Sequence, residues 1–174
     1  MPALTPPSMM VHASFVAAIP ACHAEGRWLD RDPAVLSAPA AFAAFVGGLL
    51  ARADPATPRA HDEVPSSVYW WTEGTEFLGR ITIRHALNDR LREAGGHIGY
   101  EVAPAHRRQG HALAMLGAAL PVAYGLGLER VLLTCEAGNV GSRRVIEAHG
   151  GRLHDSSAGK LRYWLVTGPC EDAS

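Results

Sequence analysis

The stretch that decides the fold is 102-VAPAHRRQGHA-112. Residues 100–102 have the aromatic and β-branched character of a strand end, the proline stops that strand, and an apolar helical pattern follows the histidine. The first N–H groups of a helix have no partner within it and lie at the positive end of its dipole, so they attract anions. With Arg107 and Arg108 before Gly110, the stretch predicts a cradle for a phosphate group.

A second motif lies downstream, Asn139-x-x-Ser142, followed by residues 143–149 and the pair Gly150-Gly151. Together, in this order and spacing, the two motifs resemble the pyrophosphate loop and the asparagine helix of the Gcn5-related N-acetyltransferase (GNAT) superfamily. Residues 84–88 and 95–100 further resemble a bacterial subgroup of predicted acetyltransferases, so that the likeness spans about residues 68–165. The resemblance implies that acetyl-coenzyme A, the acetyl donor, contacts Tyr100, Val102, Arg107, Arg108, Gln109, Gly110, His111, Ala112, Asn139 and Ser142.

Hydrophobic periodicity and turn residues place the elements along the chain. Helices are expected at 11–27, interrupted at Pro20, and at 39–53, with a stripe of Phe42, Phe45, Val46, Leu49 and Leu50; a loop follows to residue 65. Strands are expected at 67–72, 77–84, 97–102 and 130–135, helices at 109–126 and 140–149, and a closing hairpin at 152–154 and 161–166. This order predicts an α/β (α+β) fold with a mixed sheet flanked by helices. The resemblance adds a mostly antiparallel GNAT-like sheet in which two neighbouring parallel strands, 97–102 and 130–135, splay apart.

Length, composition and net charge limit the functions that the chain can have. A length of 174 residues with 48% hydrophobic residues suits a single domain, 1–174, with its own core. A formal net charge of −1 gives no general attraction to nucleic acids or anionic membranes. Cys22, Cys135 and Cys170 are an odd set without CxxC spacing, which argues against a disulfide framework. We therefore expect a soluble cytoplasmic protein with no nucleic acid or membrane partner.

Acetyl transfer to an amine requires a group that takes the amine proton and a group that protonates the departing thiolate. In the family a tyrosine often supplies the acid, but that position falls here at Ile146, which cannot donate a proton. Tyr100 or Ser142 is therefore the expected acid, if one is needed. No residue has the character of a covalent relay, and direct transfer in a ternary complex is expected.

The sequence offers several candidates for the proton acceptor. Strand alternation puts Ile98, Tyr100 and Val102 on one face, where the family's bases usually lie, and neither Gly96 nor Ile98 titrates. We expect His85 as the leading base, since its ordinary pKa suits neutral pH, with Glu101 or Glu136 next. A role for His85 in organising its loop is an equal alternative.

Metal binding and nucleotide binding explain these residues less well. His106 and His111 lack further ligands at useful spacing, so no metal is expected. The glycine pattern matches neither a P-loop nor a Rossmann fingerprint. A second function, an acyl-coenzyme A binding sensor or structural subunit without activity, stays open because of Ile146. We expect a small-molecule amine as the acceptor, with an amino acid, an antibiotic amine and a protein N-terminus left open. The weak acidic balance favours a small or cationic acceptor over nucleic acid, and the resemblance and the exposed apolar hairpin favour a homodimer.

Overall fold

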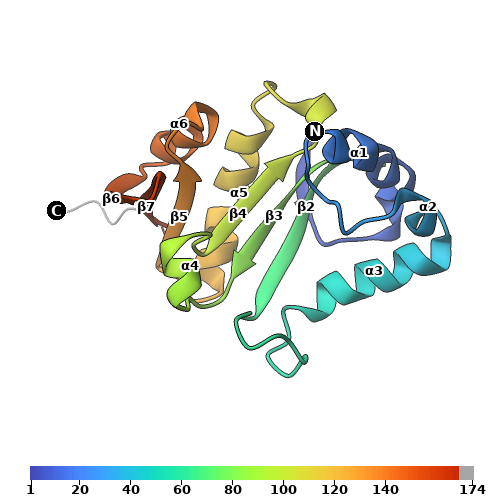
Figure 1. Ribbon diagram of the computed structural model, residues 1–174, viewed down its shortest axis with the longest axis horizontal. Coiled ribbons are helices and arrows are strands. Elements are labelled where there is room, and N and C mark those ends of the chain that lie inside the picture. The colour runs from blue at the N-terminus through green and yellow to red at the C-terminus, as the bar shows by residue number, and fades with distance from the viewer. Residues whose placement is uncertain (169–174) are drawn as a thin grey trace.

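The structure is a computed structural model in which residues 1–168 are described, so Cys170 lies outside the described residues. Two antiparallel sheets form its centre, with strand orders β1-β2-β3-β4 and β5-β7-β6 (Figure 1). The strands are β1 (Ala3–Thr5), β2 (Ser66–Glu73), β3 (Glu76–Arg84), β4 (Ile98–Val102), β5 (Arg130–Glu136), β6 (Arg152–Ser157) and β7 (Lys160–Val166). The helices are α1 (His12–Ala24), α2 (Pro33–Leu36), α3 (Pro39–Ala51), α4 (Asp89–Glu93), α5 (His111–Gly125) and α6 (Val140–Ala148), with 3-10 turns at Met9–Val11 and Pro104–His106.

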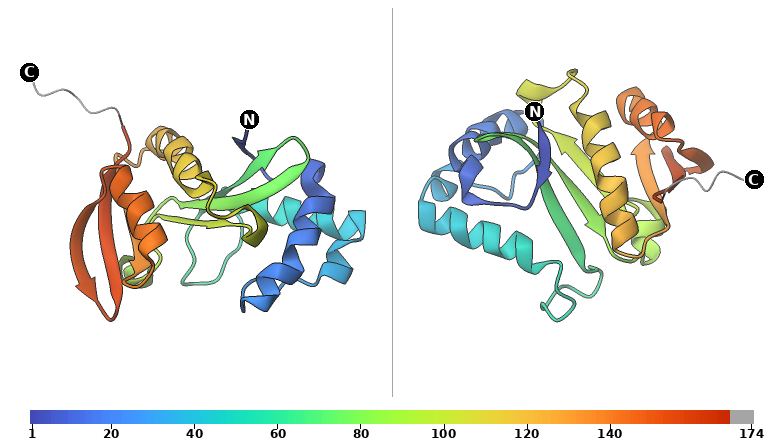
Figure 2. Two further views of the ribbon diagram at one scale, coloured as in Figure 1. Left: turned by 90° about the horizontal axis from the view of Figure 1, so that it is seen from above. Right: turned by 180° about the vertical axis from the view of Figure 1, so that it is seen from behind.

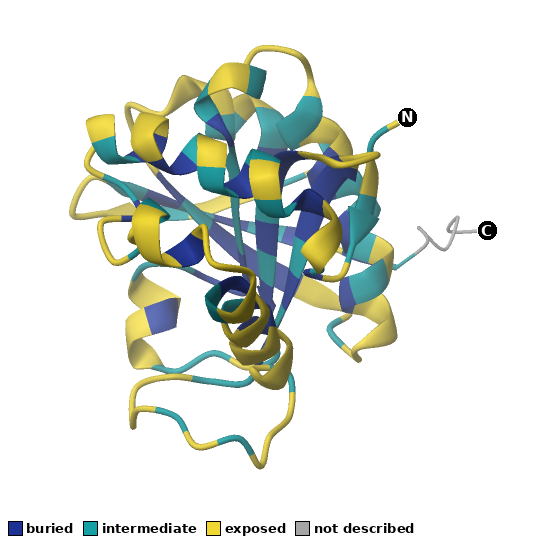
Figure 3. Cartoon of the chain, turned by 90° about the vertical axis from the view of Figure 1, so that its right-hand side faces the viewer, coloured by how far each residue is buried: buried dark blue, intermediate teal, exposed yellow. Residues whose placement is uncertain are grey.

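Helices cover the four-stranded sheet on its two faces, α1 and α3 on one and α5 on the other (Figure 2). Alternation along the strands supplies both faces with apolar side chains. The buried residues appear as dark blue segments through the centre of the molecule in Figure 3. One core gathers Phe15, Phe42, Val68, Trp70 and Phe77 under the N-terminal helices. The other packs α5 and α6 against both sheets through Ile81, Ile83, Ile98, Met115, Leu116, Leu133 and Ile146.

The two sheets meet at one point, where β4 and β5 begin, and then diverge. The His97 N–H donates to the Leu132 carbonyl at 2.7 Å, and the Leu132 N–H donates to Nδ1 of the buried His97 ring at 2.9 Å. Beyond this junction β4 and β5 belong to different sheets. The expected α/β fold with a splayed strand pair is therefore confirmed.

Some elements differ from the sequence expectation. Helix α1 runs through Pro20 without interruption, because this residue faces solvent, where water can bond the freed carbonyl, while Phe15, Ile19 and Cys22 hold the opposite side in the core. Strand β1 and the short helices α2 and α4 were not expected from periodicity. In α3, Leu50 is exposed rather than part of the buried stripe, and Phe45 is only half-buried.

No helix among residues 1–168 is both long enough and apolar enough to cross a bilayer. Cys22 and Cys135 are buried free thiols, and burial raises the pKa of each above its ordinary value. Neither thiol is therefore suited to nucleophilic chemistry at neutral pH.

Candidate functional site

A cleft of about 530 Å³ opens where β4 ends and α5 and α6 begin. The sequence-predicted coenzyme residues converge on it from four segments, the end of β4, the 103–110 loop, the first turn of α5 and the region from Asn139 into the first turn of α6. All of them except Gln109 line the cleft. Glu25, Arg27 and Glu101 line it from the side of the N-terminal helices.

The start of α5 presents unpaired backbone donors to this cleft. Ala114 donates backward to the Gly110 carbonyl at 3.1 Å, so the N–H groups of His111, Ala112 and Leu113 have no carbonyl one turn before them. Gly110 has a φ of +81°, which favours glycine, and a Cβ there would meet nothing within 4 Å. The helix end is therefore open to an anion.

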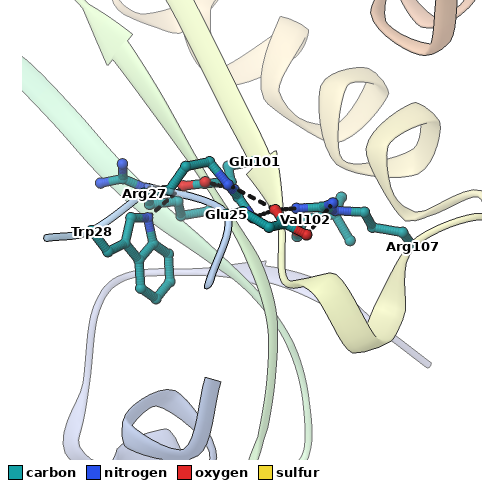
Figure 4. A network of polar contacts seen from close by, with 7 residues as sticks. Glu25, Arg27, Trp28, Glu101, Val102 and Arg107 are labelled. Atoms are coloured by element: carbon teal, nitrogen blue, oxygen red, sulfur yellow. Dashed lines mark hydrogen bonds and ion pairs between the residues drawn. The ribbon is translucent and has the colours of Figure 1, made fainter. Parts of the chain in front are cut away.

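The side chains of this loop are arranged differently from the simple expectation of two free arginines. Arg107 forms a bidentate ion pair with Glu25, at 3.0 and 2.8 Å, and its Nε donates to the Val102 carbonyl at 3.2 Å (Figure 4). Arg108 is exposed and has a positive φ of 62°. The Arg107 charge is thus partly neutralised by Glu25, while Arg108 remains directed to solvent at the cleft rim.

The remaining loop side chains are held by neighbouring residues. Trp71 donates from Nε1 to Nδ1 of His111 at 3.2 Å, and His106 lies 3.3 Å from a carboxylate oxygen of Glu76. Gln109 reaches only the Ala105 carbonyl, at 3.5 Å. In this loop it is the backbone, more than the side chains, that is free to bind a ligand.

The first turn of α6 forms the opposite wall. The Asn139 side chain caps the helix by accepting from the Ser142 N–H at 3.0 Å, and the Tyr100 hydroxyl donates across the cleft to the Ser142 carbonyl at 3.4 Å. Burial raises the pKa of Tyr100, so its hydroxyl stays protonated at neutral pH. Tyr100 is thus a proton donor placed between the diverging strands, whereas Ile146 lies in the core.

Glu101 lies on the opposite face of β4 and is the centre of a polar network (Figure 4). Its carboxylate accepts from the Trp28 indole at 2.6 Å, from Arg80 Nε at 3.2 Å and from Arg27. Trp28 has a φ of 57°, an uncommon conformation for a bulky residue and one often found at functional sites. Burial lowers the pKa of Arg80 to about 10.

The structure does not bring His85 or Glu136 to the cleft. His85 follows the far end of β3, six residues from Gly79, the partner of Val102, or about 20 Å along the strand. Its Nε2 lies 2.9 Å from the Ser67 hydroxyl, and burial lowers its pKa. Glu136 pairs with Lys160 at the end of β5. The loop-organising alternative for His85 fits these contacts, and of the expected bases only Glu101 borders the cleft.

Sequence reasoning missed the contribution of the N-terminal half. Glu25, Arg27 and Trp28 lie in the connection between α1 and α2, where nothing local marks them as site residues. Arg80 and Arg84 could have been identified from the sequence, because they lie on one face of a central strand whose other face is apolar. Across residues 1–168 no group of three or more metal-ligating side chains is found.

Comparison with known proteins places this geometry in a family. Residues 29–152 match the model of the acetyltransferase (GNAT) domain, while no curated protein sequence matches the chain. Among solved structures, the chain is similar to Mycobacterium smegmatis RimJ in complex with CoA-disulfide, with a TM-score of 0.67, 22% identity, and coverage of 95% of this chain and 81% of that one.

Two further structures show the same fold. The microcin C7 self-immunity acetyltransferase MccE, in complex with acetyl-CoA and AMP, has a TM-score of 0.63 and 13% identity, covering 95% of this chain and 92% of that one. Salmonella typhimurium yncA, a putative acetyltransferase with acetyl-CoA, has a TM-score of 0.58 and 14% identity, covering 100% of this chain and 96% of that one. The family match covers most of the chain, which therefore belongs to the acetyltransferase (GNAT) domain family.

Proposed function

We propose that this protein is an acetyl-coenzyme A dependent N-acetyltransferase that acts on a primary amine by direct transfer in a ternary complex. The observation that carries the proposal is the cleft in which three free N–H groups at the start of α5 face open space beside Gly110. These donors suit a diphosphate. The similar solved structures described above are complexes with CoA-disulfide or acetyl-CoA.

The coenzyme would lie with its diphosphate on His111, Ala112 and Leu113 and its pantetheine arm in the gap between β4 and β5. Tyr100 and Val102 would bond that arm from one side, and Asn139 and Ser142 from the other. For the Val102 carbonyl to accept from the arm, Arg107 must release it, and Arg107 then has a phosphate as an alternative partner. The N–H groups and Arg108 supply the remaining positive charge.

Tyr100 is the proposed acid. Its hydroxyl lies between the two diverging strands and is protonated at neutral pH, so it can donate its proton to the thiolate as the carbon–sulfur bond breaks. The products are the acetylated amine and free coenzyme A. Ser142 contributes its carbonyl, which fixes the position of the tyrosine hydroxyl.

Glu101 is the proposed acceptor of the amine proton. It borders the coenzyme cleft from the face of β4 turned toward the N-terminal helices, and its side chain is 17% exposed. The amine nitrogen forms its bond to the acetyl carbon and passes one proton to this carboxylate, which returns it through water to Tyr100. Arg27, Arg80 and Trp28 hold the carboxylate in place during this exchange.

The test compares two glycines that share a backbone conformation. Gly110→Val places a side chain in the space reserved for the diphosphate, and we expect calorimetry to show at least a tenfold loss of acetyl-CoA affinity. Gly127→Val is the matched control, because Gly127 has a φ of +83° and equally open surroundings at the other end of α5. It should lose similar stability and keep the affinity. Equal affinity in both variants would overturn the diphosphate site.

The alternative, a coenzyme-binding sensor or structural subunit, is favoured by Ile146 at the position of the usual tyrosine acid. A coenzyme A release assay over a panel of amines decides between them. Turnover supports the transferase, whereas tight acetyl-CoA binding without turnover on any amine supports the sensor. A cytoplasmic location and a homodimer complete the proposal, and light scattering tests the latter.

A further inference from the structure

A second cavity lies behind Glu101, on the face of β3 and β4 turned toward the N-terminal helices. Its volume is about 360 Å³, and it is lined by Arg27, Arg80, Thr82, Arg84, Gly99, Tyr100 and Glu101. Arg27, Tyr100 and Glu101 also line the coenzyme cleft, so the two spaces adjoin at the proposed reaction centre. A molecule seated in this cavity would reach the acetyl group from the side opposite the diphosphate.

The lining of this cavity carries more positive than negative charge. Three arginines line it with one carboxylate, Glu101, which Arg27 and Arg80 share, and Arg27 also pairs with Glu25 of the adjoining cleft. Arg84 donates from Nη1 to the carbonyls of Gly95 and Gly96, each at 3.1 Å, and has no carboxylate partner among residues 1–168. Arg84 is thus a positive charge without a counter-ion, and Arg80 has only a carboxylate that it shares with Arg27.

A fourth arginine adds to this excess from behind. The Arg31 guanidinium lies 4.3 Å from the centroid of the Trp28 ring, and Arg80 lies 5.5 Å from that ring. In Arg31, Nε and Nη1 are buried without a hydrogen-bond partner among the described residues. Burial, and then the neighbouring charge of Arg31, lower the pKa of Arg80 to about 10, although the Asp30 carboxylate partly opposes this shift. Gathering like charges in a partly buried place is unfavourable unless an anion joins them.

The arginine-lined surface continues along β3. A third cavity, of about 210 Å³, shares Arg80, Thr82 and Arg84 with the one behind Glu101 and adds Arg52 and Arg90. Those two arginines have carboxylate partners of their own, Glu63 at 3.7 Å and Asp62 at 3.3 Å. Arg84 lines both cavities and is therefore the arginine between them that has no carboxylate partner among residues 1–168.

We propose that the acceptor is an amine that also carries an anionic group, a carboxylate or a phosphate, bound by Arg84 and Arg80 while the amine lies at Glu101. This inference rests on the proposed acetyltransferase function and names its substrate class. It replaces the expectation of a cationic acceptor, which relied on the net charge of the whole chain. The charge of the cavity lining is positive, whereas the net charge of the whole chain is −1.

The first experiment measures coenzyme A release with pairs of amines that differ only in the anionic group. An ω-amino carboxylate is compared with its carboxamide, and O-phosphoethanolamine with ethanolamine, at one ionic strength. We expect the anionic member of at least one pair to have a kcat/KM at least tenfold higher. Which pair shows the preference separates a carboxylate from a phosphate. Equal or better turnover of the neutral members overturns the proposal.

Three variants then test whether Arg84 causes the preference for anionic amines. Arg84→Gln should raise KM for the anionic amine and abolish most of the preference, with kcat and acetyl-CoA affinity retained. Arg84→Lys, which keeps the charge but not the bidentate geometry, should retain part of the preference. Arg152→Gln is the control, because Arg152 is an exposed arginine on β6 far from these cavities. Loss of the preference in the control, or its survival in Arg84→Gln, contradicts the assignment.

A second measurement does not depend on turnover. The protein is saturated with coenzyme A, which occupies the diphosphate site, and inorganic phosphate is added against sodium chloride of equal ionic strength. We expect phosphate to raise the Tm of the wild type and of Arg152→Gln, but not of Arg84→Gln. If no amine is acetylated, the transferase proposal fails while this shift still supports the anion site; no shift in the wild type overturns the anion site alone.

Discussion

In the proposed mechanism, Tyr100 supplies the acid in place of the residue at position 146. Its hydroxyl reaches from β4 to the Ser142 carbonyl of α6, whereas Ile146 is buried in the core. Tyr100→Phe removes the proton donor and keeps the ring packing, so we expect kcat to fall about 100-fold while acetyl-CoA affinity stays within twofold. Stopped assays and calorimetry measure the two values.

The pH dependence of kcat tests the role of Tyr100 independently. Because burial raises the pKa of Tyr100, the wild-type enzyme should show no alkaline loss of kcat from this group up to pH 9. Ser142→Ala tests the other expected acid: it removes the hydroxyl but leaves in place the backbone carbonyl that Tyr100 bonds, so kcat should stay near the wild-type value. A Tyr100→Phe variant with wild-type kcat would remove tyrosine from the mechanism.

At the scale of elements, the decisive feature is the junction at which β4 and β5 meet before they splay. Gly96 has a φ of +61°, and a Cβ there would lie 2.2 Å from the Leu132 carbonyl oxygen. Gly96→Ala should therefore destabilise the protein by about 3 kcal/mol, measured by urea denaturation. Gly150→Ala, with a φ of +81° and open surroundings, should cost only about 1 kcal/mol. Similar losses in both would show that the strands do not pack this closely.

For the molecule as a whole, the two sheets are joined through His97, whose Nδ1 accepts from the Leu132 N–H and so carries no proton. Burial lowers the pKa of His97 in the folded state. Its contribution to stability is complete above the unfolded pKa of about 6.5 and falls as the pH drops below that value, because only the unfolded chain then takes up the proton. We expect the free energy of unfolding to decrease between pH 7 and 5.

The His97 contribution is isolated by substitution. His97→Asn offers an amide oxygen to the Leu132 N–H and does not titrate, so its loss of stability between pH 7 and 5 should be smaller than that of the wild type. His61→Asn, at an exposed position, is the control and should keep the wild-type slope. A wild-type slope in His97→Asn would assign the acid sensitivity to other groups.

The sequence by itself determined the central strands, α5, α6 and the loop between β4 and α5. Their signals are local: alternation along a strand, helical periodicity, and a glycine with adjacent arginines. For the same reason it located ten of the sixteen residues that line the cleft and missed Glu25 and Arg27. It did not determine β1, α2 or α4, which are short and stable only because they pack against the rest of the chain.

Only the tertiary structure decided which charged groups meet at the proposed reaction centre. It separated His85 from the cleft, because register places that residue at the far end of β3, and it brought Glu25 and Arg27 onto the cleft from a connection more than 70 residues upstream of β4. It also gathered Arg27, Arg80 and Arg84 in the lining of one cavity beside Glu101, which gives that cavity a positive charge that the nearly neutral composition hides. Local patterns fix local structure, whereas the electrostatic character of a site depends on distances between residues far apart in the chain.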